Sequence, residues 1–182
     1  MTNSTLQTNK NIPYYLAALG VFVLLKFGFR FADNDDLVFL LKPTDTLVGI
    51  LTGSYSVYLI NEGYYHDTFN ILIGKSCSGF NFWVLCFLLF SCLAIKYFEK
   101  PIHKIMALPA ALIFAYLLTV FVNTSRIVAS IAAANFMQNQ QRLLHEAIGI
   151  MTNISFLILI FYLTEKFLRQ KLSKHKHHAK TP

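Results

Sequence analysis

The sequence predicts an all-α membrane protein of about four transmembrane helices, with a small extracytoplasmic helix and a β-hairpin before the second span. Hydrophobic residues make up 55% of the 182 residues and charged residues only 14%, whereas soluble domains carry roughly a quarter charged residues. Four apolar runs are long enough to cross a bilayer core, which takes about 20 helical residues. A soluble domain of this length has no interior large enough to bury such runs.

The four spans are expected at residues 12–31, 80–98, 105–134 and 145–166, inside a membrane domain of residues 12–168. Residues 1–11 precede the first span, and residues 169–182 form a basic tail. The first run does not resemble a cleaved signal peptide, because Lys26 and Arg30 lie near its far end and no small-residue cleavage site follows. These two cations are expected to snorkel or to face protein.

The segment between the first two spans, residues 32–79, is polar and acidic. It holds six of the nine acidic residues: Asp33, Asp35, Asp36, Asp45, Glu62 and Asp67. We expect Thr44-Asp45-Thr46 to cap a short helix that ends near Thr52 and is too short to span. Two runs of β-branched and aromatic residues, Tyr55–Ile60 and Tyr64–Ile73, flank the turn sequence Asn61-Glu62-Gly63 and predict a β-hairpin. A re-entrant segment over residues 44–73 is the alternative.

The orientation follows from the distribution of basic residues. The connector from Lys96 to Lys104 and the tail after Lys166 are both short and basic, so the positive-inside rule places them in the cytoplasm. Residues 32–79 and the connection between the third and fourth spans are then extracytoplasmic, and both termini are cytoplasmic. The net charge of +7 is concentrated in the tail, which fits contact with anionic lipid and not with nucleic acid.

Three polar residues are expected at one depth near the outer membrane face. A helix rises about 1.5 Å per residue, so about 20 residues cross the hydrocarbon core. Counting outward from Lys104 places Arg126 at the outer boundary. Counting back from Lys166 places His145 there, and counting back from Lys96 places Cys77 there. Three separate counts therefore put Cys77, Arg126 and His145 on the same side of the membrane.

Each of these residues also has an ordinary structural interpretation. A cysteine before a span can be a small packing residue, an arginine an interfacial anchor, and a histidine the polar start of a helix. Their shared depth favours a functional role, because an ionisable residue inside an apolar run is costly unless it is paired.

The chemistry that these three residues permit is acyl transfer. A thiolate at Cys77 is a strong nucleophile, and a neighbouring imidazole or guanidinium lowers a thiol pKa. His145 can protonate the leaving amine, and Arg126 can stabilise the carbonyl oxyanion or hold a substrate carboxylate. Possible supporting residues are those that flank the nucleophile or share a helix face with Arg126: Ser76, Ser78, Gly79 and Asn123. If a helix begins at Phe80, its amides also favour the thiolate.

Other chemistries find less support. His145-Glu146-Ala147-Ile148-Gly149 lacks the second histidine of the H-E-x-x-H zinc motif, so no metal and no cofactor are expected. Cys86 and Cys92 read as small apolar residues inside a span. They lie about 13 Å and 22 Å of helical rise beyond Cys77, too far for a disulfide. A G-x-S-x-G serine motif is absent from the sequence.

Three blocks of the sequence resemble those of a known family. Ser76-Cys77-Ser78-Gly79-Phe80-Asn81-Phe82, Asn123-Thr124-Ser125-Arg126-Ile127 and His145-Glu146-Ala147-Ile148-Gly149 are similar to the three motif blocks of the exosortase/archaeosortase family, in order, approximate spacing and placement against the spans. The stretch Leu40 to Gly53 is similar as well, so the resemblance covers roughly Asp36 to Leu163. The short chain resembles the compact exosortase K type.

The resemblance implies a membrane-embedded cysteine transpeptidase or protease in a bacterial inner membrane, with Cys77, Arg126 and His145 in the three catalytic positions. Its partners would be exported proteins that end in a sorting signal, together with membrane lipid. Cleavage would form an acyl-enzyme on Cys77 for hydrolysis or for transfer to a glycan or lipid acceptor. The alternative is a non-catalytic transporter or assembly factor in which Arg126 and His145 bind an anionic ligand.

Overall fold

The computed structural model describes the backbone of residues 2–134 and 141–178 and the side chains of residues 10–133 and 147–170. Within these residues, four helical segments are long and apolar enough to cross a membrane: Lys10–Phe31, Lys75–Tyr97, Pro101–Ala133 and Ala147–Gln170. They belong to helices α1 (Thr2–Phe31), α3 (Phe80–Tyr97), α4 (Pro101–Ala134) and α5 (Gln141–His178). The prediction of a multi-pass helical membrane protein is confirmed.

Three of the four long helices, α1, α4 and α5, begin before the predicted spans. Helix α1 already begins at Thr2, and α5 continues to His178. Helix α4 begins at Pro101, four residues earlier than the predicted span. Proline suits the first position of a helix, because its fixed φ matches the helix and the first N–H needs no partner within the helix.

Helix α2 (Val38–Thr52) lies between α1 and the small sheet, after a 3₁₀ turn at Asp35–Leu37. The prediction that Thr44-Asp45-Thr46 begins this helix is wrong, since the helix starts six residues earlier. The hydroxyls of Thr44 and Thr46 instead donate to the carbonyls of Leu40 and Lys42 at 2.8 and 2.9 Å. Threonine can satisfy its hydroxyl in this way inside a helix.

Pro43 does not break α2, because a side chain from another helix replaces the bond that proline cannot make. Proline has no N–H for the carbonyl four residues earlier, which here belongs to Phe39. The hydroxyl of Tyr116 on α4 donates to that carbonyl at 2.8 Å. The proline position therefore also anchors α2 to α4.

Three short antiparallel strands follow in the order β1 (Val57–Leu59), β2 (Gly63–His66) and β3 (Ile71–Ile73). The expected hairpin is present between β1 and β2, with Val57 opposite Tyr65. The second expected strand is not continuous. A 3₁₀ turn at Asp67–Phe69 and the left-handed residue Asn70 (φ 53°) divide it, and β3 folds back on β2. Asp and Asn favour such turns.

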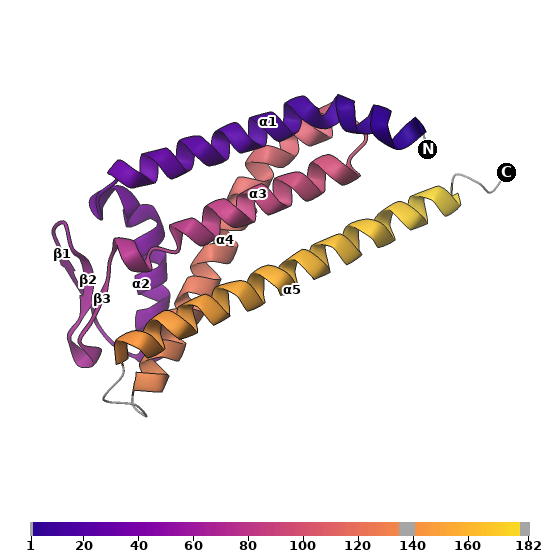
Figure 1. Cartoon of the computed structure of the whole chain (residues 1–182). Coiled ribbons are helices and arrows are strands. Elements are labelled where there is room, and N and C mark those ends of the chain that lie inside the picture. Colours follow the sequence, from indigo (N-terminus) through magenta and orange to yellow (C-terminus); the bar gives the residue numbers. More distant parts are fainter. Residues whose placement is uncertain (1, 135–140, 179–182) are drawn as a thin grey trace.

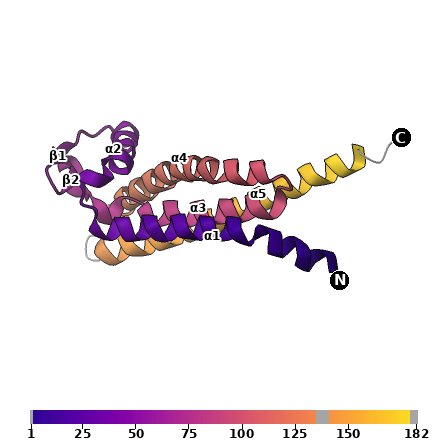
Figure 2. The ribbon, with the colours of Figure 1, turned by 90° about the horizontal axis from the view of Figure 1, so that it is seen from above.

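Helix α3 is the centre of the bundle and contacts α1, α4 and α5. Of its membrane-length segment 61% is buried, against 6% for the segments of α1 and α5, so those two helices present most of their residues to lipid. Figure 1 shows α2 and the sheet at one end of the bundle, where α3 begins. The start of α1 and the end of α5 lie at the opposite end, and Figure 2 shows the same arrangement from above.

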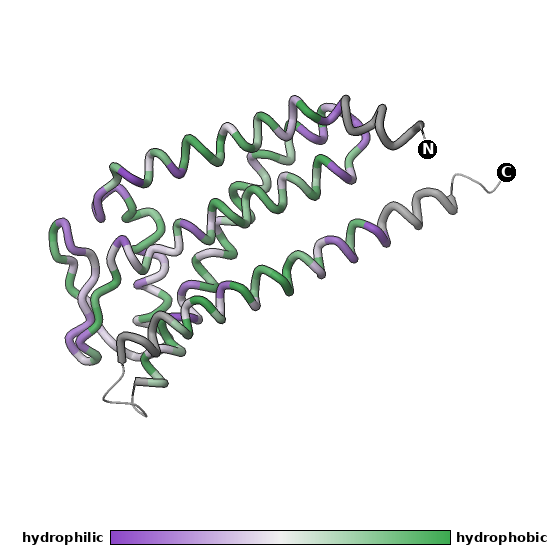
Figure 3. Tube along the Cα trace, viewed as in Figure 1, coloured by the Kyte–Doolittle hydropathy of each residue, from purple (hydrophilic) through white to green (hydrophobic). Residues whose placement is uncertain are grey.

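The colouring by hydropathy in Figure 3 shows apolar residues along the middle of the four long helices and polar residues towards their ends. At the end that holds the start of α1, polar side chains join the helices. Lys104 donates to the side chain of Asn11 at 2.5 Å, and Asn11 donates to the carbonyl of Ile95 at 3.5 Å. Glu165 on α5 accepts from Tyr97 at 3.0 Å and from Arg169 at 2.8 Å.

Candidate active site at one end of the bundle

Cys77 closes a 3₁₀ turn, Lys75–Cys77, directly before α3. As predicted, α3 begins at Phe80, with Gly79 at the N-cap in the left-handed region (φ 71°). A Cβ at Gly79 would lie 3.0 Å from Thr119 Cγ2 and 3.2 Å from Asn123 Cγ. Glycine is therefore needed here both for its backbone conformation and for the close approach of the turn to α4.

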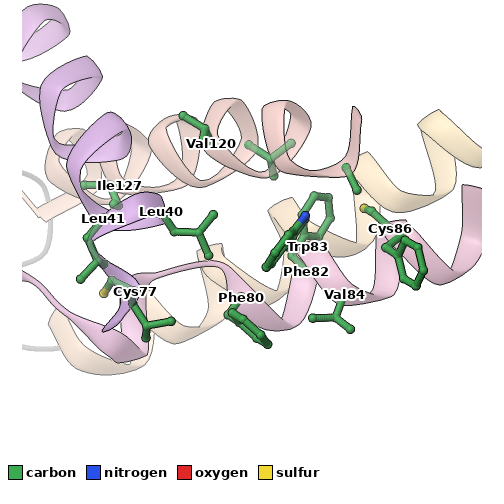
Figure 4. Packing of buried hydrophobic residues seen from close by; sticks show 14 of the residues in the cluster. Leu40, Leu41, Cys77, Phe80, Phe82, Trp83, Val84, Cys86, Val120 and Ile127 are labelled. Carbon is green, nitrogen blue, oxygen red and sulfur yellow. The ribbon is translucent and has the colours of Figure 1, made fainter. Parts of the chain in front are cut away.

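The backbone of Cys77 is held on both sides. Its N–H donates to the carbonyl of Gly74 at 2.8 Å, and its carbonyl accepts a hydrogen bond from the buried side chain of Asn123 at 2.5 Å. The side chain of Cys77 is buried in the apolar cluster, which Figure 4 shows together with Leu40 and Leu41 of α2. The hydroxyl of Ser76 lies 3.9 Å from the Cys77 sulfur.

Arg126 reaches the same region from α4. Its Nε atom is buried and has no hydrogen-bond partner among the described residues. A Cβ at Gly149 on α5 would lie 3.2 Å from Arg126 Cδ and 3.6 Å from Nη1. The guanidinium therefore occupies the space that the missing side chain of Gly149 leaves. Buried polar groups are nearly always satisfied in native proteins, so an orphaned Nε indicates a place where a ligand belongs.

A cavity of about 520 Å³ lies at this point. Its polar wall combines two cations with hydroxyl and amide groups, and its apolar wall is aromatic. The polar residues are Lys75, Ser76, Ser78, Asn81, Arg126 and Asn153, and the other lining residues are Phe29, Gly79, Phe80 and Phe82. The structure thus brings the predicted residues Ser76, Ser78, Gly79 and Arg126 around one cavity. Ser76 and Ser78 flank Cys77 in the chain.

The third predicted residue, His145, belongs to the start of α5, and its side chain lies outside the described residues. Its position on the helix is informative nevertheless. Residues four apart share a helix face, so position 145 is on the face that carries Gly149 and Asn153. That face contacts Arg126 and lines the cavity.

Lys75, Asn81 and Asn153 line the cavity but are not among the site residues that the sequence predicts. The Lys75 ammonium donates to the carbonyl of Ala32 at 2.5 Å and lies 5.1 Å from the centre of the Phe29 ring. Lys26 on α1 donates to Asn81 at 2.6 Å, so this cation faces protein, one of the two outcomes expected for it. One feature of the sequence points to Lys75 as a site residue: it is one of only two Lys or Arg residues in the acidic segment 32–79.

A second polar cluster, buried between α2 and the sheet, was not anticipated either. His66 on β2 is 1% exposed, with Nε2 2.9 Å from Asp45 Oδ1 and Nδ1 2.8 Å from Ser54 Oγ. Ser56 donates to the other oxygen of Asp45 at 3.0 Å. A cavity of about 460 Å³ adjoins Asp45, Ser54 and Ser56. These residues share the composition of a Ser-His-Asp hydrolase triad.

The direction of the hydrogen bonds argues against serine catalysis at this cluster. Thr52 donates its only hydroxyl proton to the carbonyl of Val48 at 2.7 Å. Ser54, which lies 2.7 Å from the Thr52 oxygen, must then donate to Thr52, and His66 must donate its Nδ1 proton to Ser54. A catalytic histidine has to accept the serine proton. The cluster instead joins α2 to β2 through the hydrogen bonds of the His66 ring with Asp45 and Ser54.

Within residues 10–133 and 147–170, no three His, Cys, Asp or Glu side chains converge as metal ligands would. Comparison with protein-family models, with curated proteins and with solved structures returned no match for this chain. The resemblance to exosortases therefore rests on the three motif blocks and the stretch Leu40 to Gly53.

Proposed function

We propose that this chain is a membrane-embedded cysteine transpeptidase or protease with Cys77 as nucleophile, Arg126 as oxyanion-stabilising residue and His145 as general acid and base. The orphaned, buried Nε of Arg126 beside the cavity is the observation that carries the proposal. A donor kept without a protein partner is pre-organised for charge that appears only during reaction. The face shared by residues 145, 149 and 153 supports the inclusion of His145.

The proposed reaction has two steps. His145 takes the thiol proton, and the Cys77 thiolate attacks the scissile carbonyl, so that a C–S bond forms and the oxygen becomes an anion next to Arg126. The C–N bond then breaks, and His145 returns the proton to the leaving amine. A hydroxyl or amine acceptor, or water, attacks the thioester in the second step and loses its proton to His145. The C–S bond then breaks, and the departing Cys77 thiolate takes this proton back from His145, so that the thiol is restored.

The proposed orientation places the cavity, α2 and the sheet on the extracytoplasmic face of a bacterial inner membrane, with both termini in the cytoplasm. The basic connector at Lys96–Lys104 and the basic end of α5 support it through the positive-inside rule. Substrates would then be exported proteins that end in a sorting signal, and the acceptor would be a glycan or a lipid.

A non-catalytic function is the second candidate, because the cavity is lined by Lys75 and Arg126 and, among the described side chains, by no acidic one. Such a cavity can hold an anionic ligand without any chemistry at Cys77. In that case, a transporter subunit or assembly factor would use the same residues for binding, and the thiol would be incidental.

Co-expression with proteins of the same genome that carry C-terminal sorting tails separates the two candidates. We expect the wild-type chain to shorten such a substrate and Cys77→Ala, Arg126→Ala and His145→Ala to abolish the shortening, with membrane insertion verified for each variant. Cys92→Ala, which removes a thiol deeper in α3, is the matched control and should retain activity. Processing by the Cys77→Ala protein would end the catalytic proposal and favour the binding one.

Thiol reactivity tests the nucleophile without a substrate. We expect maleimide at neutral pH to modify Cys77 faster in the wild type than in Arg126→Ala and His145→Ala, because a nearby cation or base raises the thiolate fraction. Rates measured by mass spectrometry that do not differ among these proteins would remove the support for an activated thiol.

A further inference from the structure

The cavity next to Arg126 carries more positive charge than catalysis requires. Lys75 and Arg126 both line it, and Lys26 reaches its rim through Asn81. Among the described residues, the ion pairs join His66 to Asp45, and Lys96 and Arg169 to Glu165, and none includes Lys26, Lys75 or Arg126. The positive charge of the cavity is therefore available to a ligand.

Both lining cations keep donors for that ligand. Lysine has three N–H donors and arginine five. The bond from Lys75 to the carbonyl of Ala32 uses one donor and fixes the ammonium in the wall, while Arg126 keeps at least the buried Nε. A compact ammonium and a planar guanidinium on opposite elements suit a group with several anionic oxygens, which a phosphate provides.

The surroundings of the cavity belong to a membrane interface. Phe29, Phe80 and Phe82 form its apolar wall, and it is lined by α1 and α5 as well as by α3 and α4. The membrane-length segments of α1 and α5 are only 6% buried, so lipid surrounds this side of the bundle. About 20 residues separate Arg126 from Lys104 at the other face, which is the thickness of the hydrocarbon core. Lipid phosphates lie at this depth.

We propose that the cavity is a binding site for the phosphate of an anionic membrane lipid, held by Lys75 and Arg126, with the acyl chains along the exposed faces of α1 and α5. The inference relies on the membrane depth of the cavity and not on catalysis. A non-catalytic binder would carry this site permanently, and in an enzyme the lipid phosphate and the oxyanion of the reaction would occupy Arg126 in turn. Failure of the lipid test would leave the proposed function standing, and loss of processing in Cys77→Ala would leave lipid binding intact.

The test uses the full chain in uncharged detergent micelles with fluorescently labelled phosphatidylglycerol, and reads binding by polarisation. We expect Lys75→Gln to weaken binding about tenfold, because one charge-assisted hydrogen bond and one positive charge are lost. Lys42→Gln is the matched control. Lys42 is exposed on α2, so this variant loses the same charge at the same end of the molecule and should bind like wild type.

Two further variants guard against a misfolded Lys75→Gln protein. Lys75→Arg keeps the charge and should retain binding. Asn81→Asp keeps an acceptor for Lys26 but brings a negative charge into the cavity, and it should weaken binding several-fold through repulsion. Equal affinity in Lys75→Gln, Asn81→Asp and Lys42→Gln would overturn the proposal.

Competitors identify the source of the phosphate. Unlabelled phosphatidylglycerol should displace the probe, and phosphatidylcholine should require at least about tenfold more, because its choline brings a cation to the site. Displacement by phosphatidylcholine at the same concentration would contradict recognition of an anionic headgroup. Glycerol phosphate that competes as well as the lipid would assign the site to a soluble phosphate ester and overturn the membrane-lipid proposal.

Discussion

The two buried polar regions of this protein differ in one respect that separates structure from function. Around His66, every donor has an acceptor: Asp45, Ser54, Ser56 and Thr52 form a closed set between α2 and the sheet. Around Arg126, a buried Nε has no acceptor among the described residues, although a cavity adjoins each of the two regions. A satisfied network stabilises the fold, whereas an unsatisfied donor carries a cost that only a ligand or a transition state removes. The familiar residue types of the first cluster are thus less informative than the orphaned atom of the second.

Removal of His66 should have the largest effect on stability. His66→Ala leaves the buried side chains of Asp45 and Ser54 without the hydrogen bonds of the ring, and we expect the free energy of unfolding to fall by about 3 kcal/mol. Unfolding of the purified protein in detergent measures this change. The double variant with Asp45→Asn should recover part of the loss, because a buried amide without a partner costs less than a buried carboxyl group without one. A loss in His66→Ala below about 0.5 kcal/mol would show that the cluster is not the structural element described.

Arg126 should behave in the opposite way. Arg126→Gln is expected to change the free energy of unfolding by less than about 1 kcal/mol, since the Nε makes no hydrogen bond to lose. Substrate processing should nevertheless fall by about 10²–10³-fold, as is typical when an oxyanion donor is removed. Arg169→Gln, which removes an exposed arginine bound to Glu165, serves as control and should leave processing unchanged. If Arg126→Gln unfolds the protein instead, the distinction between the two regions is lost.

Gly149 offers a smaller change at the same place. A Cβ would lie 3.2 Å from Arg126 Cδ, so Gly149→Ala should displace the guanidinium by a few tenths of an ångström and reduce processing about tenfold. Alanine otherwise favours a helix by up to about 1 kcal/mol over glycine. Gly28→Ala on α1, where no atom lies within 4 Å of the added carbon, isolates this helix effect. Equal activities of the two variants would remove the positioning role of Gly149.

The smallest expected effect is on the titration of an exposed pair, Tyr58 and Asp35. The hydrogen bond from Tyr58 to Asp35 raises the pKa of Tyr58 to about 12. Because the folded pKa is raised, the associated stability is present below the ordinary pKa near 10 and is lost as the pH rises through about 12. Absorbance titration should therefore show a phenolate that forms near pH 12 in the wild type and returns towards the ordinary pKa in Asp35→Asn. An unchanged titration would mean that the pair does not persist in solution.

Sequence reasoning located the spans because hydropathy is a local property, and each apolar run of sufficient length had to become a helix. It placed the start of α3 at Phe80 for the same reason. It failed at α2, because the polar triplet at residues 44–46 resembles a helix start and Pro43 resembles a boundary. The carbonyl of Phe39, which the proline leaves without its helical donor, is satisfied by the hydroxyl of Tyr116, 77 residues further along the chain.

The same limit applies to the functional site: sequence reasoning finds properties local to one helix and misses contacts between helices. Cys77, Arg126 and His145 could be grouped from the sequence because each lies about 20 residues from a basic residue at the other face. The rise of a helix converts this number of residues into a depth in the membrane. Sequence distance does not reveal that Gly149 accommodates the guanidinium or that Lys75 lines the cavity, since these are contacts between helices. His66 and Asp45 are 21 residues apart, and their pairing depends on how the sheet folds onto α2. That fold-back includes the turn at Asp67–Phe69, which the β-rich composition concealed.

The hydrogen bonds of Asn11 have a consequence for the order in which the protein is assembled. Asn11 stands at the start of the first membrane-length segment, yet its partners are the carbonyl of Ile95 and the ammonium of Lys104, 84 and 93 residues later. The Asn11 amide therefore meets these two partners only after α3 and the beginning of α4 have left the ribosome. Until then, on the cytoplasmic side of the proposed orientation, water can satisfy it. Truncation before Lys104 would accordingly produce a chain that inserts but lacks the hydrogen bond that joins Lys104 to Asn11 at the start of α1.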